Sequence, residues 1–76
     1  MNRLALEIAE RIRERRLALG LSKSQLSLQA GLSRSYVRKI EEDGVRITVE
    51  KLLLISRVLN CTITDLIPPD HEDLLN

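Results

Sequence analysis

The chain has 76 residues, 43% of them hydrophobic, and its single aromatic residue is Tyr36. This length suits one domain, and a domain so small buries only about 60% of its unfolded surface, so that a second subunit would add stability. The scarcity of aromatic side chains argues against the stacking platforms that bind single-stranded nucleic acid. Residues 1–64 contain all twelve Lys and Arg residues against seven acids, whereas residues 65–76 contain four acids. A basic body of this kind suits a polyanionic partner.

Composition also argues against several other classes of protein. Cys61 is the only cysteine, so that an intramolecular disulfide is excluded, and we expect a buried structural thiol. His71 is the only histidine, and nothing pairs it with a nucleophile or a second metal ligand, so we expect no enzyme activity, cofactor, metal or small-molecule ligand. The charged N-terminal segment does not suit a secretory signal, and the longest apolar run, 52–55, is too short to span a membrane. We expect a cytoplasmic protein.

Apolar residues recur at helical spacing almost throughout, which predicts an all-α bundle of five short helices. The first helix is expected over 4–18 and is followed by Gly20, a residue that tolerates the left-handed closing conformation. Ser22 predicts the start of the second helix, 23–30, because Gln25 stands three residues later and completes a capping box.

The next two helices are also marked by capping residues. Ser33 is expected to cap a third helix over 34–42, and Thr48 a fourth over 49–59, which Asn60 closes. The residues expected to face inward are Ile8, Ile12, Leu19, Val37, Ile40, Val49, Leu52, Ile55, Ser56 and Leu59.

The end of the chain predicts a fifth, shorter helix. Thr62 and Asp65 have the spacing of a second capping box, and the prolines at 68–69 terminate the helix. We therefore expect one domain over 1–69, followed by a short acidic tail over 70–76.

The second and third helices are separated only by residues 31–33. So short a turn sets two helices at a steep angle, which is the arrangement of a DNA-reading helix-turn-helix. Gly31 tolerates the positive φ that such a turn needs. Ser27 is small enough for the helices to approach closely, and the Val37 side chain is expected to fill the space between them.

These segments resemble the phage-repressor Cro/cI-type family of helix-turn-helix proteins, also called the XRE family. The resemblance covers roughly residues 8–67 and is carried by Ile12-Arg13-Glu14-Arg15-Arg16, Leu19-Gly20-Leu21-Ser22, Ala30-Gly31-Leu32-Ser33-Arg34-Ser35-Tyr36-Val37, Ile40-Glu41, Leu52-Leu53 and Val58-Leu59. Arg34-Ser35-Tyr36 with Ile40-Glu41 is also similar to the controller proteins of restriction-modification systems. The resemblance implies a lambda-repressor-like bundle that binds double-stranded DNA.

The resemblance also implies which residues contact DNA. The third helix should lie in the major groove, where Arg34 or Lys39 could bind guanine. Lys23 stands where the family usually has glutamine, but lysine also binds phosphate. Arg46 matches family residues that touch the backbone or the minor groove. The full expected DNA-binding set is Lys23, Ser33, Arg34, Ser35, Tyr36, Arg38, Lys39 and Arg46.

Two further sets of residues have expected structural roles. Arg16 and Glu41 match a family pair that bonds across the bundle. Leu54 falls on the polar side of the fourth helix and could join an apolar patch that forms a dimer interface. The expected interface residues are Leu54, Leu59, Ile63, Leu66 and Ile67.

The sequence therefore predicts a sequence-specific transcriptional regulator that binds a near-palindromic operator as a homodimer. Repression by occlusion of polymerase and activation through the acids at 41–43 are both compatible with it. An antitoxin, or another protein-interaction module of the same fold, is the alternative. It is ranked second because the segment after the prolines is short.

Overall fold

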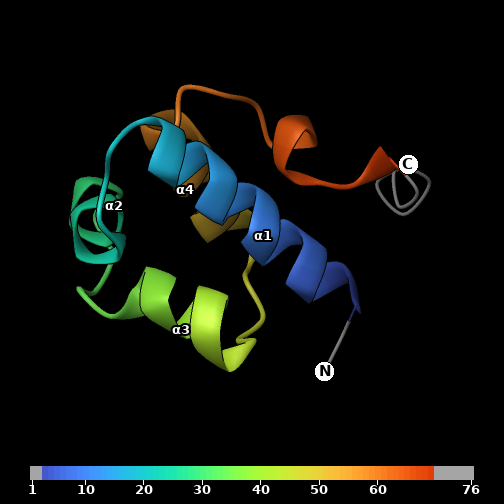
Figure 1. The fold of residues 1–76 in the computed structure, drawn as a ribbon, viewed down its shortest axis with the longest axis horizontal. Coiled ribbons are helices and arrows are strands. Elements are labelled where there is room, and N and C mark those ends of the chain that lie inside the picture. Colours follow the sequence, from blue (N-terminus) through green and yellow to red (C-terminus); the bar gives the residue numbers. More distant parts are fainter. Residues whose placement is uncertain (1–2, 70–76) are drawn as a thin grey trace.

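The computed structural model describes residues 3–69, which form four α-helices, one 3-10 turn and no strand (Figure 1). The elements are α1 (Arg3–Ala18), α2 (Lys23–Gln29), α3 (Tyr36–Asp43), α4 (Val49–Val58) and η1 (Thr64–Leu66). The expected all-helical class is confirmed. Within residues 3–69, no helix is both long enough and apolar enough to span a bilayer. The acidic tail expected over 70–76, with His71, lies outside the described residues.

The expected fifth helix is a 3-10 turn instead. Asp65 accepts a hydrogen bond from the backbone N–H of Thr62 at 2.9 Å and returns its own N–H to the Thr62 hydroxyl at 3.3 Å. The N–H of Thr62 lowers the pKa of Asp65. The predicted box is therefore present. The prolines at 68–69 follow so closely, however, that the backbone closes only i→i+3 bonds, such as Leu66 N–H to Ile63.

The starts and ends of the other helices are largely as expected. Ser22 and Gln25 exchange both bonds of a capping box at the start of α2. Gly20, Gly31 and Asn60 all have positive φ. A Cβ added at Gly31 would meet no atom within 4 Å, so it is the φ of +75° that favours glycine there.

The start of α3 differs from the prediction. We expected Ser33 to cap a helix from residue 34, but α3 begins at Tyr36, and Ser35 precedes it without a side-chain cap. The reason is a competing bond. The N–H of Tyr36, which a Ser33 hydroxyl would need, is donated at 3.0 Å to the main-chain carbonyl of Ser33.

The core lies where all the elements meet and is wholly aliphatic. Its buried members are Ile8, Ala9, Ile12, Leu26, Ala30, Val37, Ile40, Leu52, Ile55, Leu59, Leu66 and Ile67. Two inward predictions were wrong: Leu19 is 51% exposed and Val49 is 70% exposed. Leu19 lies in the turn beyond α1, and Val49 is the first residue of α4. Leu54, expected on the polar side of α4, is half-buried against the core.

A buried hydroxyl joins α2 to α3. Ser27 is fully buried, and its Oγ donates to the Lys23 carbonyl at 2.9 Å and accepts from the Val37 N–H at 3.0 Å. The side chain is thus small enough for the close crossing and also satisfies a donor in the first turn of α3. Ser56 is also buried, but its hydroxyl donates only to Leu53 of its own helix.

We predict that Ser27→Ala lowers the free energy of unfolding by about 1–3 kcal/mol, because it leaves the buried Val37 N–H without an acceptor. Ser56→Ala is the matched control and should cost clearly less, since it leaves no donor unpaired. Urea unfolding of both variants measures the difference. Equal losses would show that Ser27 only fills space.

Candidate nucleic-acid interface

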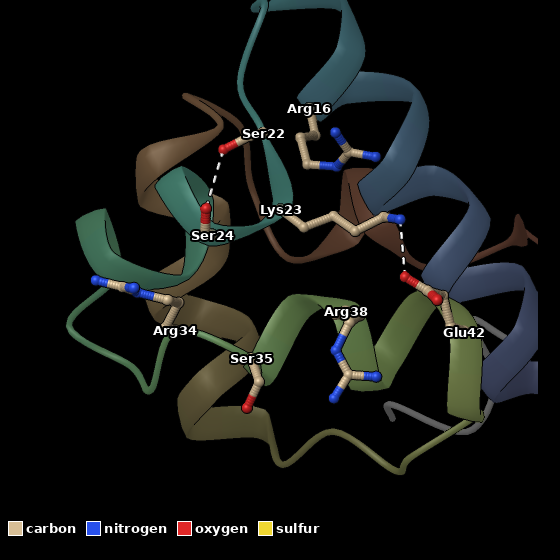
Figure 2. A pocket seen from close by; sticks show the side chains of 8 residues that line it. All are labelled: Arg16, Ser22, Lys23, Ser24, Arg34, Ser35, Arg38 and Glu42. Atoms are coloured by element: carbon tan, nitrogen blue, oxygen red, sulfur yellow. Dashed lines mark hydrogen bonds and ion pairs between the residues drawn. The ribbon is translucent and has the colours of Figure 1, made fainter.

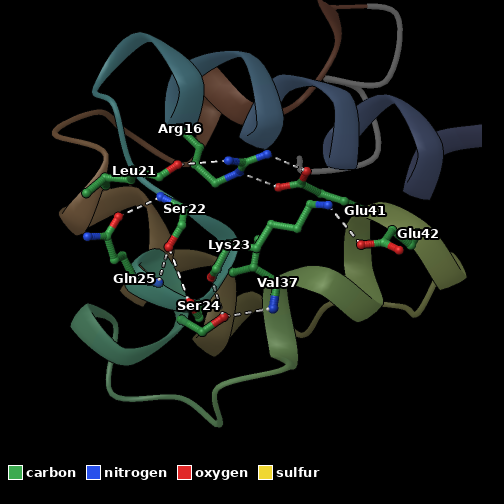
Figure 3. A network of polar contacts seen from close by, with 10 residues as sticks. Arg16, Leu21, Ser22, Lys23, Ser24, Gln25, Val37, Glu41 and Glu42 are labelled. Atoms are coloured by element: carbon green, nitrogen blue, oxygen red, sulfur yellow. Dashed lines mark hydrogen bonds and ion pairs between the residues drawn. The ribbon is translucent and has the colours of Figure 1, made fainter.

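One buried arginine connects three parts of the chain. The Arg16 guanidinium donates to Glu41 through Nε at 2.8 Å and Nη2 at 2.9 Å, and to the Leu21 carbonyl through Nη1 at 2.8 Å (Figure 3). The two charged side chains are only 7% and 4% exposed. The expected pair between α1 and α3 is therefore present. The bond to Leu21, which the sequence did not indicate, also anchors the approach to α2.

Beside this pair, an open groove of about 640 Å³ separates the start of α2 from the outer face of α3 (Figure 2). Its lining residues are Arg16, Ser22, Lys23, Ser24, Arg34, Ser35, Arg38 and Glu42. Half of the expected DNA-binding set thus lies around one groove: Lys23 comes from α2, Arg38 from α3, and Arg34 and Ser35 from the turn before α3.

The basic residues at this groove differ in their partners. Lys23 forms an ion pair with Glu42 at 2.8 Å, and Arg38 forms a longer one with Asp43 at 3.6 Å. Arg34 is exposed and has no hydrogen bond or ion pair with any residue in 3–69. Because Arg34 stands just before α3, its guanidinium is available at the N-terminal end of that helix.

Glu42 is an acidic groove residue that the sequence did not assign to the DNA-binding set. The hydrogen bond from Lys23 is the main cause that lowers the pKa of Glu42, and the positive charges of Lys23 and Arg38 add to it. Helical spacing contained a signal, because Glu42 follows Arg38 by four residues and so lies on the same face. Nothing in the local sequence indicated its bond to Lys23, nineteen residues earlier.

The rest of the expected DNA-binding set lies outside this groove. Ser33 and Lys39 are exposed, and Arg46 is exposed beside a separate apolar hollow near the start of α1. Tyr36, also expected to contact DNA, is half-buried against the core, and Lys51 Nζ lies 4.8 Å from its ring centroid. This burial raises the pKa of Tyr36.

The expected dimer contact needs correction. Leu59, Leu66 and Ile67 are buried in the chain's own core, so they present no surface to a partner. The prediction was wrong there because η1 folds back, with its apolar side chains turned inward. Of the expected interface residues, only Leu54 and Ile63 remain partly exposed.

Cys61 is half-buried rather than buried, and it packs against the core. Burial is the largest influence on its thiol and raises its pKa, which disfavours the reactive thiolate. Residues 3–69 contain no group of three or more His, Cys, Asp or Glu side chains able to hold a metal ion.

A family model described as helix-turn-helix matches residues 12–66, which include α2, the turn, α3 and the residues of the buried ion pair. The chain belongs to this helix-turn-helix family. Its XRE-type character, indicated by the sequence, is confirmed.

Relatives within the helix-turn-helix family include restriction-modification controllers. The chain is 30% identical over 60 residues to control protein C.SmaI of Serratia marcescens. The aligned region covers 79% of this chain and 71% of that protein. It is also similar to the crystal structure of the restriction-modification controller protein C.AhdI from Aeromonas hydrophila, with a TM-score of 0.78 and 30% identity. That match covers 83% of this chain and 96% of the other. The expected resemblance to controller proteins is confirmed.

The same fold also forms part of a larger protein. Hydroxypropylphosphonic acid epoxidase from S. wedmorenis matches with a TM-score of 0.78 and 26% identity, over 91% of this chain but only 37% of the enzyme. This likeness is therefore to a segment of the enzyme and gives no support for the same reaction here.

We predict that Glu41→Gln lowers the free energy of unfolding by about 3 kcal/mol, because the buried Arg16 charge loses its counter-charge. Asp43→Asn, an exposed change on the same helix, should leave stability close to that of the parent protein. Urea unfolding tests both. Replacing the pair together, by Arg16→Met with Glu41→Leu, should cost less than Glu41→Gln alone. A larger cost for the double change would contradict this account.

Proposed function

We propose that this helix-turn-helix protein is a sequence-specific transcriptional regulator that binds double-stranded DNA as a homodimer. The observation that carries the proposal is the groove between α2 and α3. There Lys23, Arg34 and Arg38 gather beside the short turn between α2 and α3. The named relatives make control of restriction-modification genes the specific form of the proposal.

In the proposed complex, α3 enters the major groove with its N-terminal end toward the bases. Arg34 carries the main base contact, because its planar guanidinium can bind guanine O6 and N7 together and is not engaged elsewhere in residues 3–69. Ser35 and Arg38 line the same groove and contact neighbouring bases or phosphates. Arg46 contributes a contact to the DNA backbone.

A two-fold dimer would present two such interfaces to DNA, one from each protomer. One protomer measures 31 × 25 × 21 Å, so two protomers side by side can place their α3 helices about 34 Å apart, one turn of DNA. The operator would then be a near-palindrome. Because Leu54 and Ile63 are the partly exposed members of the expected contact, we propose that they form it together with the exposed Leu53 of α4.

The dimer contact is tested by Leu53→Asp, which should weaken self-association because it places a charge in an apolar interface. Leu28→Asp on α2 is the matched control, since Leu28 is also an exposed leucine but lies outside the proposed contact. Sedimentation equilibrium measures the self-association of both variants. A dimer that survives Leu53→Asp unchanged would contradict this placement.

The DNA contact is tested on sites selected from random duplexes at one stated salt concentration. Arg34→Ala should weaken operator binding by about 1–3 kcal/mol and relax preference at one base position in each half-site. Arg46→Ala should weaken all sequences alike and flatten the salt dependence. Arg57→Ala is the control, because Arg57 is an exposed residue near the end of α4 and does not line the groove. Unchanged operator affinity in Arg34→Ala would refute the assignment of α3.

A further inference from the structure

The Lys23 ammonium already has an anionic partner within the groove proposed to receive DNA. Its Nζ donates to Glu42 Oε2 at 2.8 Å, and both side chains line the groove (Figure 2). The bond joins the first residue of α2 to the last turn of α3. It therefore spans the interface instead of lying beside it.

This pair differs physically from the one next to it. Arg16 and Glu41 are almost completely buried and share two bonds, whereas Lys23 and Glu42 are 38% and 47% exposed and share one. An exposed, singly bonded pair is weak and exchanges readily with other ions. A DNA phosphate is an oxyanion like the carboxylate, so it can take the place of Glu42 on Lys23.

We propose that Glu42 is an internal competitor of DNA phosphate for Lys23, and that DNA binding requires Lys23 to exchange one oxyanion for the other. The inference rests on the proposed DNA-binding function and adds a residue to that site. Because phosphates are present in every sequence, the exchange lowers the affinity for all duplexes alike. High affinity is then reached only at sites where base contacts add to the phosphate contacts.

The salt dependence of binding follows from the same exchange. A lysine that neutralises a phosphate releases a condensed counterion, and each such contact steepens the logarithmic salt dependence by about 0.9. When Lys23 leaves Glu42, the freed carboxylate attracts a cation from solution, which offsets that release. Binding by the parent protein should therefore depend less on salt than binding by a protein without the Glu42 charge.

The experiment measures binding to a short duplex of arbitrary sequence, at several salt concentrations, for the full chain and four variants. Glu42→Gln should raise the affinity about three- to tenfold at low salt and steepen the salt slope by up to about one. Glu14→Gln makes the same charge change at an exposed position of α1 outside the groove, and should have a much smaller effect. Circular dichroism confirms that each variant is folded.

The remaining variants distinguish the exchange from simple repulsion between Glu42 and DNA. In a Lys23→Gln background, Glu42→Gln should gain clearly less affinity than in the parent protein, because only the repulsion between Glu42 and phosphate then remains. A gain as large as in the parent background would overturn the inference, as would equal gains for Glu42→Gln and Glu14→Gln. A parent protein that does not bind duplex DNA even at low salt would instead refute the proposed function itself.

Discussion

The buried Arg16 guanidinium is the interaction on which the rest of this small structure depends. It holds Glu41 by two bonds and the Leu21 carbonyl by a third, so that one side chain joins α1, the entry to α2 and the end of α3. A buried charge is costly unless it is paired and fully bonded, and this environment supplies both conditions. Because the groove between α2 and α3 lies directly beside this pair, its shape depends on the same three bonds.

The structure divides its ionic contacts into two kinds with different consequences. The buried pair of Arg16 and Glu41 cannot exchange with solvent ions, and the Ser27 hydroxyl fixes the crossing of α2 and α3 from inside. The exposed pair of Lys23 and Glu42 is open to competition by any anion that enters the groove. A rigid frame with an exchangeable surface suits a protein that docks on a polyanion without remodelling its fold (Figure 3).

Local sequence signals located most of the fold, and they failed at one competing local bond and at the sites where a tertiary contact decided the outcome. Capping residues such as Ser22 and residues that tolerate positive φ, such as Gly31, predicted the helix ends because both kinds of signal depend only on nearby residues. The start of α3 was misplaced because the Ser33 carbonyl takes the donor that its side chain would need. The dimer contact was misassigned because amphipathic spacing does not tell whether Leu66 turns toward its own core or toward a partner. Glu42 was not assigned to the DNA-binding set because its bond to Lys23 exists only after α2 and α3 cross.

The most direct measurement of the central claim is a titration of isotope-labelled protein with duplex DNA, followed through its amide resonances. If the groove between α2 and α3 receives the duplex, the largest shifts will fall at Lys23, Arg34, Ser35 and Arg38, while the exposed residues near the end of α4 will barely move. Shifts concentrated on the outer face of α1 or at the end of α4, with the groove residues unchanged, would contradict the account.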